Sequence, residues 1–192
     1  MNDARIIEMI TFNENTFDYT GTAPKPTWTN NVAGWCANLD LSVIKADAGN
    51  YTTYIPATFT KGTESFSTQK KYKYTINKGT ITASVANVSR GYGDNNPTFN
   101  ISYSGFVNGD NESVITTKPI AITTATASSN VGTYPISVSG GVAQNYTFKY
   151  ELGTLTVTKA ALEISVNKVS KVYGSVNPTF TLNYSGLKNN ET

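Results

Sequence analysis

A stretch of eight residues that recurs 81 positions later constrains this chain more than any other feature of its sequence. Residues 92–99 read Tyr-Gly-Asp-Asn-Asn-Pro-Thr-Phe, and residues 173–180 read Tyr-Gly-Ser-Val-Asn-Pro-Thr-Phe. Residues 78–111 and 159–192 align without a gap, with 15 identities in 34 positions. A match at a fixed period indicates a tandem array. We therefore expect repeated modules rather than one large domain.

The repeated stretch has the pattern of a turn followed by a strand. Apolar and polar side chains alternate at Phe99, Ile101 and Tyr103, a period of two that indicates a strand with one buried face. In the block before them, Gly accepts a positive φ and Pro pushes the preceding Asn into an extended conformation, which is typical of a turn. We expect Phe99 and Tyr103, and their copies Phe180 and Tyr184, to point into the interior of their modules.

The repeat divides the chain into three predicted modules. A first β-rich unit covers residues 1–79, a complete module covers 80–159, and the truncated start of a second such module covers 160–192. Because the sequence stops inside a repeat, we expect it to be a fragment of a longer protein. Both module boundaries are short and lack the composition of a flexible linker, so we expect the modules to lie end to end.

Four local patterns give specific expectations about secondary structure. Residues 6–12 are apolar enough to form a first strand, and the alternation at residues 39–43 predicts another. Two prolines precede Trp28 and limit strand pairing there, so we expect Trp28 on an edge strand or in a loop. Asp110 has the chemistry and position of the N-cap of one short helical turn.

Charge and composition exclude several classes of function. The chain carries 15 Lys and Arg against 13 Asp and Glu, and a net charge of +2 is no sign of nucleic-acid binding. No apolar run approaches membrane-spanning length, so we expect no membrane insertion. Cys36 is the single cysteine, which rules out an intramolecular disulfide, and we expect it to be a small, semi-buried apolar residue.

The residue types that carry most site chemistry are missing or badly spaced. Histidine is absent, which removes His-based triads, His metal ligands and the commonest general base. Asp94, Asp110 and Glu112 offer oxygens to Ca²⁺, but Asp94 is replaced by Ser175 in the next copy and EF-hand spacing is missing. Turn and cap roles are the favoured interpretation. We expect no catalytic, cofactor-binding or metal-binding residue, and hence no enzyme.

The two tryptophans of the chain, Trp28 and Trp35, both lie in the irregular part of the first unit. Aromatic faces stack on sugar rings, so these residues with Tyr51 or Tyr54 are candidates for a glycan-binding platform. The alternative, which we favour, is that one tryptophan fills the core of the unit and the other caps an edge.

Several short motifs resemble a known family. The second and third modules contain Tyr-Gly-x-x-Asn-Pro at 92–97 and 173–178, and the second also has Gly-Phe-Val-Asn-Gly-Asp at 105–110 and Gly-Thr-Leu-Thr-Val at 153–157. They resemble MBG domains of the YGX type, which are tandem modules of bacterial cell-surface and secreted proteins. The first unit resembles an Ig-like or YDG-type relative through residues 17–22 and 47–51, although Thr20 departs from that pattern.

The resemblance implies a fold and a function. It implies mostly β structure in tandem small modules, β-grasp-like or Ig-like sandwiches, with at most one short helical turn per unit and no catalytic residue. We expect a non-enzymatic stalk or spacer segment of a larger bacterial cell-surface or secreted adhesin-like protein, with neighbouring repeats as its partners. The alternative is a module that binds a surface glycan or host protein through aromatic residues of the first unit. Either function places the chain outside the cell or on its surface, with signal and anchor outside this fragment.

Overall fold

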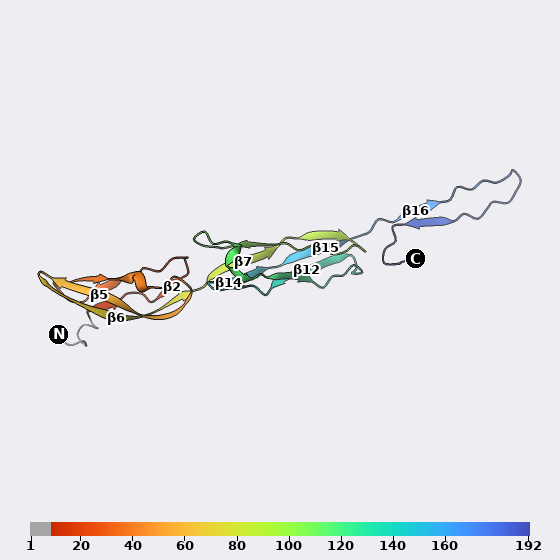
Figure 1. Ribbon diagram of the computed structural model, residues 1–192. Coiled ribbons are helices and arrows are strands. Elements are labelled where there is room, and N and C mark those ends of the chain that lie inside the picture. Colours follow the sequence, from red (N-terminus) through yellow and green to blue (C-terminus); the bar gives the residue numbers. More distant parts are fainter. Residues whose placement is uncertain (1–8) are drawn as a thin grey trace. The chain divides into compact units, whose positions relative to one another are not determined.

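The computed structural model describes residues 9–192, and these residues are mostly β-strand (Figure 1). Their helical structure consists of two three-residue 3-10 turns, η1 (Leu41–Val43) and η2 (Glu112–Val114). The expected fold class, mostly β with at most one short helical turn per unit, is confirmed. No helix of the described chain covers a sheet, so the arrangement favours sandwich-like packing over a β-grasp.

The first module contains six strands. They are β1 (Ile10–Phe12), β2 (Thr16–Asp18), β3 (Trp28–Asn30), β4 (Cys36–Leu39), β5 (Gly49–Lys61) and β6 (Glu64–Asn77). One sheet pairs β1 with β3, and the other has the order β2-β6-β5-β4. The long β5–β6 hairpin turns at Gly62, whose φ of +58° suits the first central residue of a two-residue hairpin loop. Strand β2 runs parallel to the end of β6.

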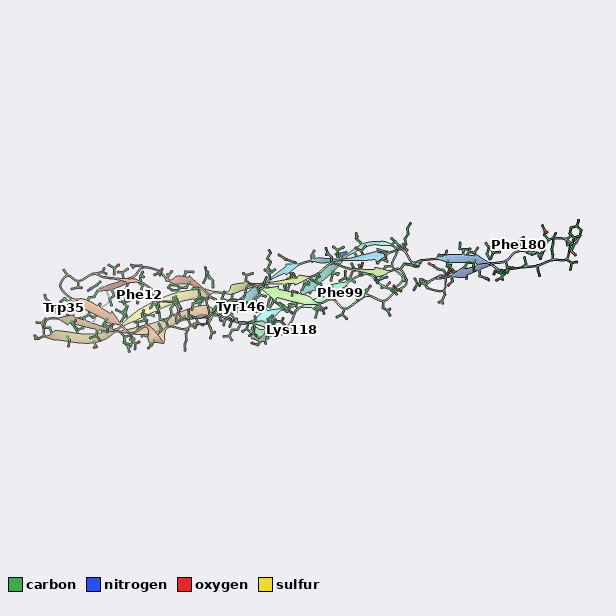
Figure 2. All side chains as sticks on the ribbon, turned by 90° about the horizontal axis from the view of Figure 1, so that it is seen from above. Phe12, Trp35, Phe99, Lys118, Tyr146 and Phe180 are labelled. Carbon is green, nitrogen blue, oxygen red and sulfur yellow. The ribbon has the colours of Figure 1, made fainter. Side chains whose placement is uncertain are left out.

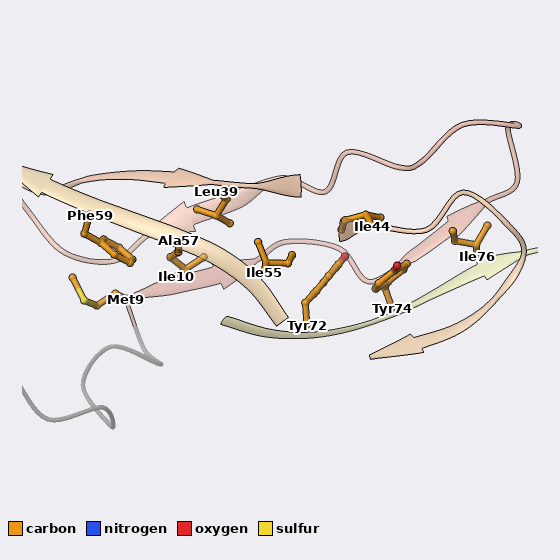
Figure 3. Packing of buried hydrophobic residues seen from close by; sticks show 10 residues of the cluster. All are labelled: Met9, Ile10, Leu39, Ile44, Ile55, Ala57, Phe59, Tyr72, Tyr74 and Ile76. Atoms are coloured by element: carbon orange, nitrogen blue, oxygen red, sulfur yellow. The ribbon is translucent and has the colours of Figure 1, made fainter. Parts of the chain in front are cut away.

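The core of the first module follows from alternation along the β5–β6 hairpin. Ile55, Ala57 and Phe59 of β5 are 0–1% exposed, and Tyr72, Tyr74 and Ile76 of β6 lie in the same buried cluster. Figure 3 shows these side chains on one side of the hairpin, facing Met9, Ile10, Leu39 and Ile44 from the rest of the module. Alternation with period two therefore places one face of each long strand in the core.

The second module is built from nine strands. They are β7 (Gly79–Val85), β8 (Val88–Gly91), β9 (Ile101–Ser104), β10 (Ile115–Thr117), β11 (Ile120–Thr123), β12 (Gly132–Ser139), β13 (Val142–Ala143), β14 (Tyr146–Glu151) and β15 (Gly153–Thr158). Its sheets have the orders β11-β12-β15-β8, β14-β7-β9 and β10-β13. Strand β8 runs parallel to β15, as β2 does to β6 in the first module.

A buried arginine supports the Tyr-Gly-x-x-Asn-Pro turn of the second module. Arg90 is 8% exposed, and its Nε donates to Oδ1 of Asn96 at 2.7 Å. Its other guanidinium nitrogens donate to the carbonyls of Gly91 and Thr126, and Nδ2 of Asn96 donates to the Ala125 carbonyl at 2.6 Å. The asparagine of the motif is therefore needed for its side chain as well as for its place before proline.

The third module contributes one hairpin, β16 (Glu163–Val166) paired antiparallel with β17 (Leu182–Ser185). Both strands are exposed along their length. Phe180 and Tyr184 are 62% and 53% exposed, so the prediction that they point into an interior is wrong (Figure 2). Their counterparts differ: Tyr103 packs against a core cluster, and Phe99 is half-buried but precedes strand β9.

Contacts between Cα atoms group the chain into two compact units. The first contains the described residues up to Ala83 together with 103–119 and 140–149, and the second contains 84–102, 120–139 and 150–192. The first compact unit therefore includes the whole first module and part of the second. The module boundaries at 79/80 and 159/160 remain predictions.

Several local expectations are corrected. Strand β1 begins at Ile10, while residues 6–8 of the expected strand lie outside the described residues. The expected strand at 39–43 is wrong beyond Leu39, because the Asp40 side chain accepts from the Ser42 N–H and caps η1. Cys36 is exposed, not semi-buried. Trp28 lies in β3 of a two-stranded sheet, which confirms the expected edge position.

Candidate functional site

The two tyrosines of the expected aromatic platform lie on opposite faces of β5. Tyr51 has the parity of the buried residues of this strand, is half-buried and stacks on Tyr74 with ring centroids 5.2 Å apart. Its hydroxyl donates to the Asp47 carbonyl at 2.9 Å. Tyr54 has the other parity and is 55% exposed. A single ligand on one face of the strand therefore cannot contact both rings.

Both tryptophans are half-buried and pack against the core of the first module. Trp35 meets Phe66 edge to face, with centroids 5.3 Å apart. Trp28 lines a shallow hollow with Pro26 and Leu41. Trp28, Trp35, Tyr51 and Tyr54 do not form one shared face, and ligand binding through them remains a prediction.

The three carboxylates considered for Ca²⁺ have three different partners. Asp94 accepts from Nζ of Lys188 at 3.2 Å, and Glu112 accepts from Nζ of Lys118 at 2.8 Å. Asp110 accepts from tyrosine hydroxyls and does not cap the helical turn, whose N-cap is Asn111. Within residues 9–192, no three His, Cys, Asp or Glu side chains are grouped so as to hold a metal ion.

Asp110 is the centre of a polar cluster in the first compact unit. Its Oδ2 accepts from the Tyr146 hydroxyl at 2.6 Å and from the Tyr19 hydroxyl at 3.2 Å. The Tyr146 hydroxyl also accepts from the Val107 N–H at 3.1 Å. Tyr19 belongs to the first module and Asp110 and Tyr146 to the second, so this cluster joins two modules inside one compact unit.

The ring of Tyr146, which is labelled in Figure 2, packs against two aromatic rings and lies close to Gly79. Tyr19 and Phe106 meet it edge to face, with centroids 5.3 Å and 6.1 Å away. A Cβ on Gly79 would lie 2.9 Å from the ring, so an alanine there would force the ring to shift. Tyr146 is 2% exposed and belongs to a cluster with Ile81. Burial and an ionised hydrogen-bond acceptor together fix this ring in one place.

The environment of the cluster raises the pKa of both phenols above the ordinary tyrosine value. Burial, followed by the hydrogen bond to Asp110, raises the pKa of Tyr146 to about 12. Burial also raises the pKa of Tyr19; a hydrogen bond with Asn145 opposes this effect, and Asp110 adds smaller upward contributions. A general acid or base needs a pKa near the working pH, and these shifts go the other way. The cluster is thus suited to a structural contact between two donors and a carboxylate.

Further hydrogen bonds connect the same two modules. Asn145 accepts from the Ala48 N–H at 2.9 Å and donates to Oδ1 of Asp47 at 2.8 Å. Asn108 donates to the Gly21 carbonyl at 3.2 Å. The Asn145-Tyr146 pair and the loop that carries Asn108 and Asp110 therefore contact the first module at residues 47–48 and at residues 19–21.

A corresponding tyrosine–carboxylate contact lies in the second compact unit. The Tyr92 hydroxyl donates to Oε1 of Glu191 at 2.7 Å, and Glu191 stands 81 positions after Asp110. The backbone places Tyr19 and Tyr92 alike. Each N–H donates, at 2.9 Å, to the carbonyl of the last residue of a long strand, which is Asn77 for Tyr19 and Thr158 for Tyr92.

The sequence contains one signal for this site, which lies in the repeat and not in a chemical motif. Asp110 and Glu191 are both acidic at equivalent positions of the repeat, although neither belongs to a known metal or catalytic motif. Tyr19 directly follows strand β2, and Tyr92 directly follows strand β8. The contact itself joins residues 91 or 99 positions apart, and no local pattern predicts such a pairing.

Comparisons with known proteins identify a family. The sequence profile of the MBG domain (YGX type) matches residues 80–156 and 162–192, which is more than half of the chain. No curated protein matches the chain. Among solved structures, the crystal structure of the Protocadherin GammaB4 extracellular domain matches with a TM-score of 0.28 and 10% identity, over 88% of this chain and 35% of that one. A likeness of this size does not establish a shared fold.

The described residues contain no helix with the length and apolar character required to cross a membrane.

Proposed function

The chain belongs to the MBG domain family of the YGX type, and from this we propose that it is a non-enzymatic structural segment of a longer protein. In the proposed function it is a spacer made of docked β modules in a bacterial cell-surface or secreted adhesin-like protein, outside the cell. Its partners are the neighbouring repeats of the same protein.

One observation carries the proposal: a tyrosine–carboxylate contact recurs at two successive module junctions, with the carboxylates Asp110 and Glu191 at equivalent positions of the repeat. A site for substrate would be expected in one module, where surface residues differ, and not at a contact whose carboxylate returns at the equivalent position of the next repeat. The raised pKa values of Tyr19 and Tyr146 support a structural role, because they move both phenols further from the pH at which a general acid or base exchanges its proton.

Small-angle scattering of the 192-residue chain tests the spacer proposal. A compact globule of this length has a radius of gyration of roughly 16 Å. We expect a larger value with a long tail in the distance distribution, because the short module boundaries leave little room for folding back. As a control, a Gly-Ser insertion after Lys159 should broaden the distribution further. A value at the compact estimate would contradict the spacer.

A further inference from the structure

We propose that the cavity beside Glu191 is an unfilled seat for a tyrosine side chain carried on an Asn-Tyr β-hairpin of the MBG type. The cavity has a volume of about 290 Å³ and lies entirely in the second compact unit. The inference deepens the proposed function, since it names what a module end recognises.

The residues around the cavity are counterparts of the residues around Tyr146. Ala160, Leu162 and Leu187 line the cavity, and they stand 81 positions after Gly79, Ile81 and Phe106. In the second module, Gly79 and Phe106 contact the Tyr146 ring, and Ile81 shares its buried cluster. Apolar or small residues at equivalent positions of the repeat therefore surround both the Tyr146 ring and the cavity beside Glu191.

The polar groups of the cavity also have counterparts: Glu191 stands 81 positions after Asp110, and Tyr92 matches Tyr19 in its backbone hydrogen bond rather than in the repeat register. Tyr92 and Glu191 line the cavity and are hydrogen-bonded to each other, as Tyr19 is to Asp110. In the first compact unit the carboxylate accepts from a second phenol, that of Tyr146. A tyrosine in the cavity would supply this second donor to the carboxylate of Glu191.

The second compact unit also offers a surface for the asparagine of the occupant, at residues 130–131. Asn145 bonds to Asp47 and Ala48, which directly precede Gly49 at the start of β5. Asn130 and Val131 precede Gly132 at the start of β12 in the same way. Both glycines have nearly equal φ values, +157° and +159°. Val131 lines the cavity and is 51% exposed.

In both segments, a tyrosine hydroxyl bonds back to the residue four positions earlier. Tyr51 donates to the Asp47 carbonyl at 2.9 Å, and Tyr134 donates to the Asn130 carbonyl at 2.8 Å. The two segments therefore have the same local conformation, which presents an equivalent surface to an incoming asparagine.

The two sites differ at one small residue, which is Gly79 beside Tyr146 and Ala160 in the cavity. Gly79 has no Cβ, and one built there would lie 2.9 Å from the Tyr146 ring. Its counterpart Ala160 carries a methyl group, which reduces the space available to a ring in the cavity. The Ala160→Gly change should therefore admit the ring more closely and tighten binding, whereas Ala160→Leu should fill the seat and abolish binding.

The seat is tested with the full chain and a synthetic peptide of the sequence of residues 140–151, which contains Asn145 and Tyr146. We expect saturable NMR shifts at Ala160, Gly186 and Leu187 with an affinity in the millimolar range, because a free hairpin is only marginally ordered. The Tyr146→Phe peptide should bind about tenfold more weakly, since it lacks the phenol donor. The Tyr146→Ala peptide should give no saturable shift.

The control peptide and the Ala160 variants distinguish a seated tyrosine from simple strand pairing. Equal shifts with the Tyr146→Ala peptide would mean backbone pairing with an exposed strand and would overturn the inference. So would the absence of saturable shifts at several millimolar peptide, or tighter binding by the Ala160→Leu chain. Small-angle scattering of the chain alone tests the spacer proposal and needs no peptide. If the peptide fails to bind, the seat is ruled out, and the scattering result still decides the proposed function.

Discussion

The two copies of the repeated hairpin have similar sequences and opposite burial. In the first copy Ile81, Ala83 and Val85 are 0%, 0% and 6% exposed. Their counterparts in the second copy, at positions 162, 164 and 166, are 50–56% exposed. In the first copy β7 lies between β14 and β9, whereas β16 pairs with β17 as a two-stranded sheet. Alternation therefore gives a strand an apolar face, but that face is buried only where other strands pack against it.

The local conformation of the two copies is nevertheless the same. Gly93 and Gly174 both have φ of +83°, and Asn108 and Asn189 have φ of +52° and +53°. Turn hydrogen bonds also recur, such as Asp110 N–H to the Val107 carbonyl, which is repeated 81 positions later at 2.9 Å. Backbone shape thus depends on nearby residues, while burial depends on strands that follow much later in the sequence.

Matched alanine substitutions should give the largest difference between the copies. Ile81→Ala removes fully buried atoms and should lower the free energy of unfolding by roughly 2–5 kcal/mol. Leu162→Ala, at the counterpart position, should change it by no more than about 0.5 kcal/mol. Denaturant titration of both variants measures the difference. Equal losses would mean that the second copy also has a packed core in solution.

Alkaline pH should destabilise the second module, which contains the first copy, through its buried tyrosine Tyr146. The pKa of Tyr146 is about 12 in the folded chain, and about 10 in an unfolded chain. Its contribution to stability is complete below pH 10 and is lost as pH rises to about 12, because the unfolded state releases its proton first. At about 1.4 kcal/mol per unit, the loss is on the order of 2–3 kcal/mol.

The measurement is the urea midpoint between pH 8 and 12. The Tyr146→Phe chain should show a shallower decline than the parent chain, since it lacks one titrating phenol. Lysines and the tyrosines outside the cluster contribute equally to both chains, so the difference reports on Tyr146 together with Tyr19, which shares the Asp110 carboxylate. Identical pH slopes would show that this hydroxyl titrates normally in the folded protein.

Substituting equivalent glycines separates local strain from global stability. Gly105 and Gly186 have φ of +93° and +98°, and a methyl group on either would overlap a backbone carbonyl, of Thr80 or Ala161. Gly105→Ala should destabilise the chain by about 1–3 kcal/mol. Gly186→Ala should disturb NMR shifts of β16 and β17 and leave the unfolding midpoint nearly unchanged. A shared effect on the midpoint would contradict the independence of the second copy.

The junction carboxylates should give the smallest difference. Asp110→Asn replaces a charged acceptor of two phenols by a neutral one, and we expect a loss of about 1 kcal/mol. Glu191→Gln affects one tyrosine contact beside an open cavity and should change stability by less than about 0.5 kcal/mol. Thermal unfolding of both variants provides the comparison. A larger effect at Glu191 would mean that the second junction is the tighter one.

The sequence predicted much of the fold but little of the junction site. Alternation correctly predicted the β character of both modules, and the two prolines correctly indicated an edge position for Trp28. Alternation failed at residues 41–43, where capping by Asp40 produced a 3-10 turn. The site was missed because Asp110 fits an N-cap pattern, and its actual partners, Tyr19 and Tyr146, are 91 and 36 positions away.

By itself, the sequence determined the repeat, the strand pattern and the conformation of the turns. These depend on side-chain alternation and on glycine, asparagine and proline, which act over a few residues. Tertiary structure alone decided which copy is buried, which carboxylate receives two phenols and where a tyrosine seat is left open. Those outcomes depend on strands such as β14, which pack against residues far away in the sequence. Burial and hydrogen bonding of a side chain are set by these long-range contacts and not by its sequence neighbours.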